Sequence, residues 1–325
     1  MEIVLKNKPQ MLILSGLPAS GKSTRAIAWV TEDPDARIRI NYDDLRVARY
    51  GPSWRFNRKE ENEMKQAAFE IAKKALRAGL SVVIDNTNLT EGVRAHWRAL
   101  GENLGAEVVY EEIDTDVRVC VDRDKLRDGS RRVGRAVIER MALFHGLLDW
   151  SDTKRYPNRF VICDIDGTLS DPGHRLHLVK GLDCDCGASS KSQCIAEGCG
   201  AQGAFKDWDK FHELVTEDTL KEPIARLLGH FRSLGYHILI CSGRWLDKGC
   251  GKATEDWLDR HGIPYDHLFM RGAGDSREDS VIKMEILELL PKERIAYVLD
   301  DRPRVLRMWQ AHGLTTLAVG SLNEF

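Results

Sequence analysis

GLPASGKST, residues 16–24, follows the apolar stretch MLILS at residues 11–15. It matches the pattern G-x-x-x-x-G-K-[ST], in which a glycine-rich turn between a strand and a helix wraps the phosphates of a nucleoside triphosphate. In this pattern Lys22 bridges the β- and γ-phosphates and Ser23 ligates Mg²⁺. The alternative is a glycine-rich turn without a ligand, which the demanding full pattern disfavours. The predicted triphosphate site consists of Gly16, Ser20, Gly21, Lys22, Ser23 and Thr24.

A second phosphate-chemistry signature begins at Asp164. DIDGTL, residues 164–169, follows the apolar stretch FVIC at residues 160–163. In such a pair the first carboxylate, Asp164, attacks phosphorus, and the second, Asp166, protonates the leaving alkoxide and then activates water. Two close carboxylates repel each other unless a cation intervenes, so we expect Mg²⁺ in this site. One half of the chain is therefore predicted to add phosphate and the other half to remove it.

Polar residues at later strand ends complete the second site. Ser242 follows an apolar stretch and is predicted to hydrogen-bond the transferred phosphoryl group. Lys283 is predicted to pair with the phosphate and the nucleophile. Each feature alone has a simpler interpretation as a turn, but their order at successive strand ends favours a phosphatase. The predicted Mg²⁺ ligands of this site are Asp164, Asp166, Asp300 and Asp301.

The composition is that of an ordinary globular protein, with 325 residues, 42% hydrophobic and 30% charged. This length suggests two domains. A net charge of −2 provides no global basic field, so a phosphate-rich polymer would have to be met by local arginine clusters. The N-terminal residues do not resemble a signal peptide, and no apolar run reaches membrane-spanning length. We therefore expect a cytoplasmic protein without membrane contact, whose eight cysteines are thiols or metal ligands.

Both halves alternate short apolar strands with amphipathic helices, which predicts an α/β fold with parallel sheets. A polar, proline-containing stretch separates an expected domain at residues 1–153 from a second at 158–325. In the first domain, the expected strands are 11–15, 37–41, 81–85 and 106–113, and the expected helices are 22–31, 60–78, 93–104, 117–127 and 135–150. In the second, they are strands 159–163, 236–241, 267–270 and 295–299, and helices 223–234, 253–261 and 279–290.

A kinase also needs a group that activates the acceptor. Asp43 and Arg46 follow the second expected strand, where the carboxylate could accept a hydroxyl proton and the arginine could clamp an acceptor phosphate. The alternative is an aspartate helix cap and a surface arginine. Asp85 ends a buried strand, where a second carboxylate could order Mg²⁺ or its water.

Five arginines crowd one expected helix and the loop beside it. They form either a solvated basic face or a lid whose positive charges neutralise the transferring phosphoryl group. They are Arg123, Arg127, Arg131, Arg132 and Arg135.

Together, residues 16–24, 40–46 and 86–89 resemble the kinase domain of bacteriophage polynucleotide kinase/3′-phosphatase. In that family a 5′-hydroxyl end of DNA or RNA receives the γ-phosphate of ATP. The resemblance implies that Asp43 is the general base and that Arg46 grips the 3′-phosphate of the acceptor.

The resemblance also concerns four further residues. Arg123 and Arg127 match the two arginines that bind ATP phosphates in the family. The resemblance also implies a catalytic role for Arg127. The family has an aspartate immediately before Thr-Asn-Leu, where this chain has Asn86, with Asp85 one position earlier. Both Asp85 and Asn86 are therefore expected on the substrate side of the site.

The second half resembles phosphatases of the haloacid-dehalogenase (HAD) type, and the same phage family carries such a domain after its kinase. There the domain removes 3′-phosphates, including 2′,3′-cyclic phosphates. Arg175 lies eleven residues after Asp164, as the substrate arginine of the family does. Arg244, Asp279 and Lys283 match its Ser-Gly-Arg and Asp-x-x-x-Lys positions, and the first two are expected to contact substrate.

One segment, residues 181–203, is rich in glycine, serine and cysteine. Four thiols so close together in a cytoplasmic chain could hold a structural Zn²⁺ that orders a small cap insertion over the phosphatase site. The alternative is a loop with incidental thiols, because the spacing is not that of a standard zinc knuckle. The predicted zinc ligands are Cys184, Cys186, Cys194 and Cys199.

The sequence therefore predicts a P-loop NTPase-type parallel sheet followed by a HAD-like, Rossmann-type phosphatase with a cysteine-containing cap insertion. The expected function is nucleic-acid end healing, by ATP- and Mg²⁺-dependent 5′-phosphorylation and 3′-dephosphorylation. The alternative is a small-molecule nucleoside or nucleotide kinase fused to a metabolite phosphatase. The expected partners are DNA or RNA ends, in the host cytoplasm for a phage protein. The sequence leaves the preference for DNA or RNA open, and it allows a homo-oligomer.

Overall fold

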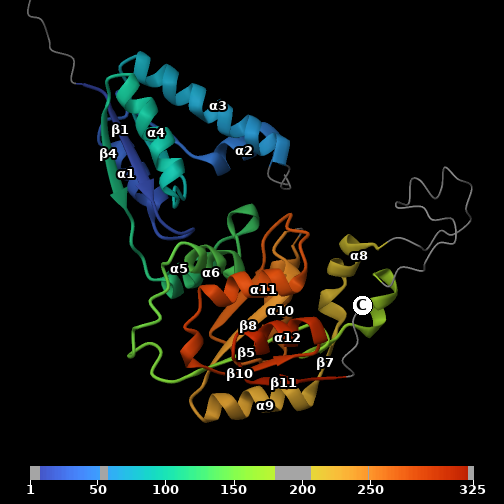
Figure 1. Cartoon of the computed structure of the whole chain (residues 1–325). Coiled ribbons are helices and arrows are strands. Elements are labelled where there is room, and N and C mark those ends of the chain that lie inside the picture. Colours follow the sequence, from blue (N-terminus) through green and yellow to red (C-terminus); the bar gives the residue numbers. More distant parts are fainter. Residues whose placement is uncertain (1–7, 52–57, 180–205, 248, 321–325) are drawn as a thin grey trace, which may run out of the picture. The chain divides into compact units, whose positions relative to one another are not determined.

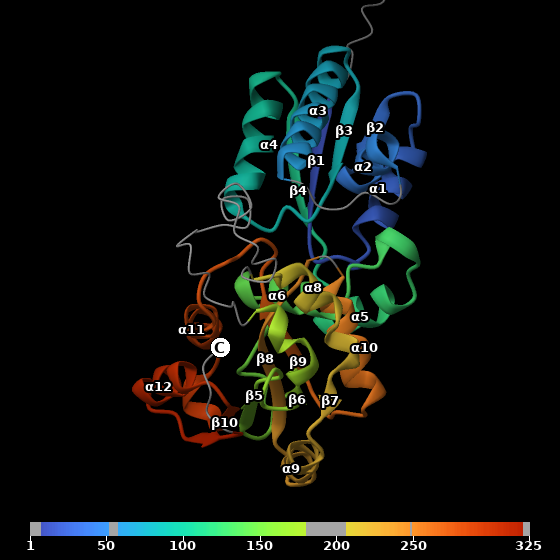
Figure 2. The same cartoon turned by 90° about the vertical axis from the view of Figure 1, so that its right-hand side faces the viewer.

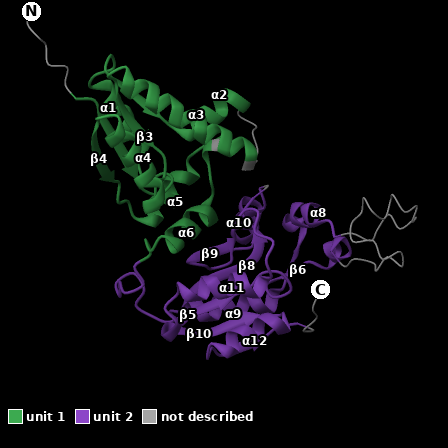
Figure 3. Ribbon diagram, turned by 45° about the horizontal axis from the view of Figure 1, so that its top comes forward, with its two compact units in different colours: residues 1–148 green, residues 149–325 purple. Residues whose placement is uncertain are grey.

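The computed structural model of the chain describes residues 8–51, 58–179, 206–247 and 249–320. The chain divides into two compact units, residues 1–148 and 149–325 (Figure 3). Each unit contains its own parallel sheet, flanked by helices (Figure 1). The predicted α/β fold with two parallel sheets is therefore confirmed. The predicted zinc ligands Cys184, Cys186, Cys194 and Cys199 lie outside the described residues.

The sheet of the first unit has four parallel strands in the order β2-β3-β1-β4. Its central strands are almost entirely buried, because helices cover both faces of a parallel sheet. In β1, Met11 and Ile13 belong to the core under α3 and α4, whereas Leu12 and Leu14 belong to the core under α1. The strands are β1 (Gln10–Ser15), β2 (Arg37–Ile40), β3 (Ser81–Asp85) and β4 (Glu107–Glu112).

Helices α3 and α4 lie next to each other on one face of this sheet (Figures 1 and 2). The helices of the first unit are α1 (Lys22–Thr31), α2 (Tyr42–Tyr50), α3 (Arg58–Arg77), α4 (Glu91–Asn103), α5 (Val117–Lys125), the 3₁₀ helix η1 (Gly129–Arg131) and α6 (Arg135–Phe144).

Two helices of this unit differ from the sequence prediction. The residues after β2 form helix α2, because the Asn41 side chain accepts a hydrogen bond from the backbone N–H of Asp44 and caps it. Helix α6 ends at Phe144 rather than at residue 150. Gly146 has φ 66°, and the Leu147 N–H bonds to the Ala142 carbonyl, an arrangement that closes a helix C-terminus.

The sheet of the second unit has five strands in the order β11-β10-β5-β8-β9, all parallel. Strand β8 continues past the predicted end through the Ser-Gly-Arg segment, and Trp245 pairs with Arg271 of β9. A short antiparallel pair, β6 and β7, was not predicted. The strands are β5 (Phe160–Cys163), β6 (Ser170–Asp171), β7 (Thr219–Leu220), β8 (His237–Trp245), β9 (His267–Arg271), β10 (Ile295–Asp300) and β11 (Thr316–Ala318).

Helices α9, α10 and α11 of this unit contact the long strand β8, and α12 contacts β10 and β11. The α-helices are α8 (Trp208–Glu213), α9 (Glu222–Ser233), α10 (Cys250–Arg260), α11 (Asp279–Glu288) and α12 (Pro303–Ala311). The 3₁₀ helices are η2 (Gly173–Leu178), η3 (Val215–Glu217) and η4 (Lys292–Arg294). Within the described ranges, no helix is long and apolar enough to cross a membrane.

Candidate active sites

The turn between β1 and α1 in the first unit surrounds a cavity of about 600 Å³. Gly16 begins this turn with φ +146°, and a Cβ at this position would lie 2.7 Å from the Ile113 carbonyl oxygen. The N-terminus of α1 begins at Lys22, so its free backbone N–H groups and positive helix end point into the turn. The cavity is lined by residues 19–25, Ala28, Ile113, Thr115, Arg123 and Arg127.

Lys22 is held against the turn it belongs to. Its Nζ donates to the carbonyl oxygens of Gly16 at 2.9 Å and Leu17 at 2.6 Å, and to Ser20 Oγ at 3.3 Å. Burial lowers the pKa of Lys22 to about 8, although the nearby Asp85 carboxylate opposes this effect. A phosphate in the cavity would replace the carbonyl contacts with a stronger, charge-assisted pair.

Two of the five predicted lid arginines, Arg123 and Arg127, line this cavity. Arg123 Nη1 donates to the Ser20 carbonyl at 3.1 Å, so the C-terminal end of α5 is joined to the P-loop. Arg127 Nη1 lies 3.6 Å from Asp124 Oδ1 and 3.4 Å from the Arg131 carbonyl oxygen. These weaker contacts leave the Arg127 guanidinium in the cavity wall, where it can meet a triphosphate.

Asp85, at the end of β3, is buried beside the P-loop. Arg39 donates to its Oδ2 through Nε at 2.7 Å, and Arg39 Nη2 lies 2.6 Å from the same oxygen. The other oxygen, Oδ1, is buried and has no hydrogen-bond partner among the residues that the structure describes. A buried carboxylate oxygen of this kind fits Mg²⁺ or its water, with Ser23 of the cavity wall as a second oxygen ligand. A bound Mg²⁺ would draw negative charge from the transferring phosphoryl group.

Asp43 and Arg46, one turn apart on α2, form an ion pair. Arg46 is also gripped by Glu61 of α3, through Nε and Nη2 at 2.8 Å each. Sequence reasoning missed Glu61, since α3 lies beyond the intervening segment. The Asp43 side chain is 73% exposed, so an external acceptor can approach it. Asn86 Oδ1 accepts from the Tyr42 N–H at 2.9 Å and so anchors the start of α2.

In the second unit a cavity of about 140 Å³ opens at the carboxyl ends of the strands. Four predicted site residues, Asp164, Asp166, Arg244 and Asp279, line it. The remaining lining residues are Trp208, Phe211, His212, Gly243, Trp245, Arg271, Ser276 and Arg302.

Lys283 is fully buried behind this cavity and contacts three carboxylates. Its Nζ lies 2.9 Å from Asp164 Oδ1, 2.8 Å from Asp300 Oδ2 and 3.2 Å from Asp279 Oδ2. Burial alone would lower the pKa of Lys283, but the three carboxylates outweigh it and raise the pKa well above its usual value. The lysine therefore stays positive next to the Asp164 carboxylate.

Asp164, Asp300 and Asp301 form a buried cluster whose ligand oxygens all lie within 4.8 Å of one another. Burial raises the pKa of Asp164, and burial together with Asp300 raises the pKa of Asp301 to about 6. This repulsive group of oxygens fits a hard cation such as Mg²⁺. Gly167 makes the cluster possible, since at φ +87° a Cβ would lie 2.0 Å from Asp301 Oδ2.

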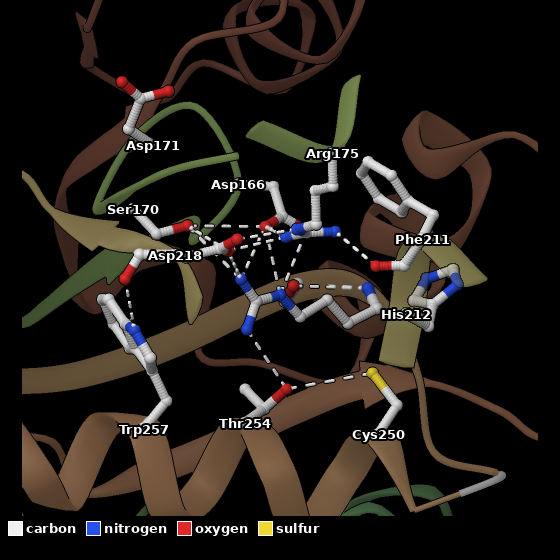
Figure 4. A network of polar contacts seen from close by, with 12 residues as sticks. Asp166, Ser170, Asp171, Arg175, Phe211, His212, Asp218, Cys250, Thr254 and Trp257 are labelled. Carbon is white, nitrogen blue, oxygen red and sulfur yellow. Dashed lines mark hydrogen bonds and ion pairs between the residues drawn. The ribbon is translucent and has the colours of Figure 1, made fainter. Parts of the chain in front are cut away.

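The Asp166 side chain, which was predicted as a Mg²⁺ ligand, does not belong to this cluster of described carboxylates. Its carboxylate instead contacts two buried arginines, of which Figure 4 labels Arg175. Arg175 Nη2 and Arg244 Nη2 each lie 2.6 Å from Asp166 Oδ1. Burial would raise the pKa of Asp166, but the two guanidinium groups outweigh it and hold the pKa well below its usual range.

Asp218, directly before β7, balances the charge of this network. It accepts from Arg175 Nε at 2.7 Å and Nη2 at 2.6 Å, and it also pairs with Arg244. Ser170 Oγ donates to it at 3.0 Å. Two buried guanidinium groups thus face two carboxylates, those of Asp166 and Asp218. No motif marks Asp218 in the sequence.

Two predicted substrate-side groups are enclosed by protein. The Arg175 guanidinium is fully buried, lies 3.9 Å from the centre of the Phe211 ring and donates to the Phe211 carbonyl at 3.1 Å. Its hydrogen bond to Asp166 Oδ1 therefore orients that carboxylate. Ser242 is also fully buried, and its Oγ accepts from the Arg244 N–H at 3.3 Å.

Comparison with known families agrees with these two sites. Residues 11–147 match a family described as an AAA domain. Residues 204–323 match one described as the polynucleotide kinase PNKP phosphatase domain. The predicted resemblance, a nucleotide-binding P-loop domain followed by a polynucleotide kinase-type phosphatase domain, is therefore confirmed.

Individual relatives are distant. Over 95% of its length the chain is 24% identical to a protein of Autographa californica nuclear polyhedrosis virus that carries the name bifunctional polynucleotide kinase/RNA ligase. The chain spans only 42% of the length of that relative.

Among solved structures, a chain of a Pnkp1/Rnl/Hen1 complex is 24% identical with a TM-score of 0.35, and the match covers 96% of this chain and 97% of that one. A haloacid dehalogenase-like hydrolase from Streptococcus pneumoniae is 17% identical with a TM-score of 0.33, covering 50% and 84% of the two chains.

Proposed function

We propose that this protein heals nucleic-acid ends, adding phosphate to 5′-hydroxyls from ATP and removing phosphate from 3′ ends. The observation that carries the proposal is the occurrence, in one chain, of two cavities whose residues suit opposite phosphoryl chemistry. The first unit has the P-loop with Lys22, Arg123 and Arg127 at its cavity, and the second has the Asp164 carboxylate beside the buried Lys283. The match to a polynucleotide kinase phosphatase family supports a nucleic-acid substrate over a metabolite.

In the first unit, Asp43 would accept the proton of the 5′-hydroxyl. The 5′-oxygen would attack the γ-phosphorus of ATP, and ADP would leave. The exposure of Asp43 suits a polymer end that arrives from solvent. Arg46, held by Glu61, would receive a phosphate of the acceptor, and Lys22, Arg123 and Arg127 would bind the ATP phosphates.

In the second unit, Asp164 would attack phosphorus, and the bond to the 3′-oxygen would break as that oxygen takes a proton from Asp166. Water would then attack the aspartyl-phosphate, with Asp166 accepting its proton, and inorganic phosphate would leave. Asp166 is held ionised by Arg175 and Arg244, as the second step requires. The first step requires a proton on Asp166, which becomes favourable when an incoming phosphate draws the Arg244 guanidinium toward itself. A Mg²⁺ at the Asp164 cluster would neutralise phosphate charge when bound.

The direct test uses an oligonucleotide that carries a 5′-hydroxyl and a 3′-phosphate, as DNA and as RNA, with ATP and Mg²⁺. Mass spectrometry should show that the 5′ end gains one phosphoryl group and that the 3′ end loses its own. Free nucleosides and nucleoside 3′-monophosphates serve as the comparison and should react much more slowly. If the enzyme turns over the monomers efficiently and does not act on the oligonucleotides, the result supports the metabolite-enzyme alternative instead.

The cytoplasmic location, the oligomeric state and the zinc site stay predictions.

A further inference from the structure

The phosphatase cavity has an aromatic wall that phosphate chemistry does not explain. Trp208, Phe211 and His212 of α8 contribute to it, and Trp245 joins them from the end of β8. We call these four side chains the aromatic wall. Trp208 and Trp245 are half-buried at the cavity, whereas Phe211 and His212 are buried behind them.

The rings of the wall support one another. His212 stacks on Trp245 with ring centroids 4.5 Å apart and an angle of 18° between the planes. Trp208 lies 6.0 Å from His212 and meets Phe211 edge-on at 5.6 Å. Phe211 in turn lies against Arg175 of the buried ion network (Figure 4). The wall is thus anchored to the same network that orients Asp166.

The wall adds no positive charge. The Trp208 carbonyl accepts from His212 Nδ1 at 2.7 Å, and burial lowers the pKa of His212, so the ring is neutral. The cationic side chains that line the cavity, Arg244, Arg271 and Arg302, come from β8, from β9 and from the N-cap of α12. The negative face of an aromatic ring does not attract an anion. The aromatic wall therefore faces a part of the substrate other than its phosphate.

Of the groups next to a 3′-phosphate, the planar nucleobase gains the most binding energy from an aromatic surface, because it can stack on the rings. We propose that Trp208 and Trp245 stack against the 3′-terminal nucleobase while its phosphate lies at Asp164, with His212 and Phe211 as positioning residues behind them. This inference rests on the proposed 3′-phosphatase function and adds to it a subsite for the terminal base. It predicts a preference for polynucleotide ends that still carry a base.

The test combines two enzymes with two substrates. Trp245→Leu and wild-type protein are compared on a 3′-phosphorylated oligonucleotide and on the same oligonucleotide with an abasic terminal residue. Stacking on one aromatic side chain should contribute about 5- to 150-fold in kcat/KM. Trp245→Leu should therefore lose about this factor on the normal end and almost nothing on the abasic end. Trp208→Leu should behave likewise, and Trp245→Phe should recover part of the loss.

The control is Trp150→Leu, which removes a tryptophan of the second unit that does not line the cavity. Any effect of this control should be equal on both substrates. If Trp245→Leu and Trp208→Leu also lower activity equally on both substrates, the wall is only structural and the inference is wrong. If wild-type protein dephosphorylates neither oligonucleotide, the proposed phosphatase function itself fails, so the two failures are distinguishable.

Discussion

Replacing Asp218 by asparagine should unbalance the buried ion network of the second unit. The carboxylate contacts Arg175 through both of its oxygens, and it also pairs with Arg244. Both guanidinium groups are essentially inaccessible to solvent, so water cannot replace the lost charge. Asp218→Asn keeps the size and one carbonyl acceptor but leaves two buried positive charges facing the single carboxylate of Asp166.

Breaking a buried ion pair by removing one partner costs about 3–5 kcal/mol. Asparagine preserves part of the hydrogen bonding, so we expect a cost at the lower end of this range. The free energy of unfolding should fall by about 3 kcal/mol. In a unit of this size each kcal/mol shifts the melting temperature by about 2–4 °C. The second unit should therefore melt about 6–12 °C lower. Phosphatase activity should also fall, because Arg244 and Arg175 would both turn to Asp166 and oppose its protonation.

Differential scanning calorimetry of the full chain can check this value. ATP should raise the melting temperature of the first unit only. The transition that ATP does not shift is then that of residues 149–325. The matched control is Asp171→Asn in the neighbouring strand β6, where the carboxylate is exposed and outside the network (Figure 4). Its effect should stay within about 0.5 kcal/mol. If Asp218→Asn were as harmless as Asp171→Asn, Asp218 would not balance the two arginines as argued.

Three further predictions concern other parts of the chain. Burial lowers the pKa of Lys22 to about 8, and only the protonated lysine pairs with phosphate. The affinity for ATP should therefore be constant below pH 8 and fall about tenfold per pH unit above pH 8. Calorimetric titrations should show this slope and its absence in Lys22→Met, and a flat wild-type profile would contradict it. Gly167→Ala places a Cβ against Asp301 and should weaken Mg²⁺ activation of the phosphatase about 10- to 100-fold, with an unchanged kinase as control. The four cysteines of residues 181–203 should bind one Zn²⁺ per chain, and metal analysis that finds none in protein purified without chelators would leave the loop interpretation.

The sequence predicts the strands that carry the sites because their side chains are buried on both faces. Strand β3 matches the predicted bounds, and β1 starts one residue earlier. Helix α2 was not among the expected helices, although an aspartate helix cap was one interpretation of these residues; the cap in the structure is Asn41. Its apolar periodicity is also weak, since α2 has no buried residue.

The candidate sites were predicted where their residues lie in short motifs. The predicted pairing of Lys283 with Asp164 is present in the structure, whereas the contact of Lys283 with Asp300 was not predicted. Asp218 could not be found in this way, because its partner Arg175 is 43 residues away, across the cysteine-containing segment. The pairing with Asp218 also holds Arg175, a predicted substrate residue, in the interior of the unit.

The central claim is that the two units perform opposite reactions at separate sites. The most direct measurement follows both ends of one oligonucleotide, with a 5′-hydroxyl and a 3′-phosphate, in Lys22→Ala and Asp164→Asn proteins. Lys22→Ala should lose about 10²- to 10³-fold of the 5′-phosphorylation rate and keep wild-type 3′-dephosphorylation. Asp164→Asn should show the reverse, and it should no longer trap beryllium fluoride, because the carboxylate that binds it is removed. Loss of both activities in either variant, with the fold intact, would contradict the account.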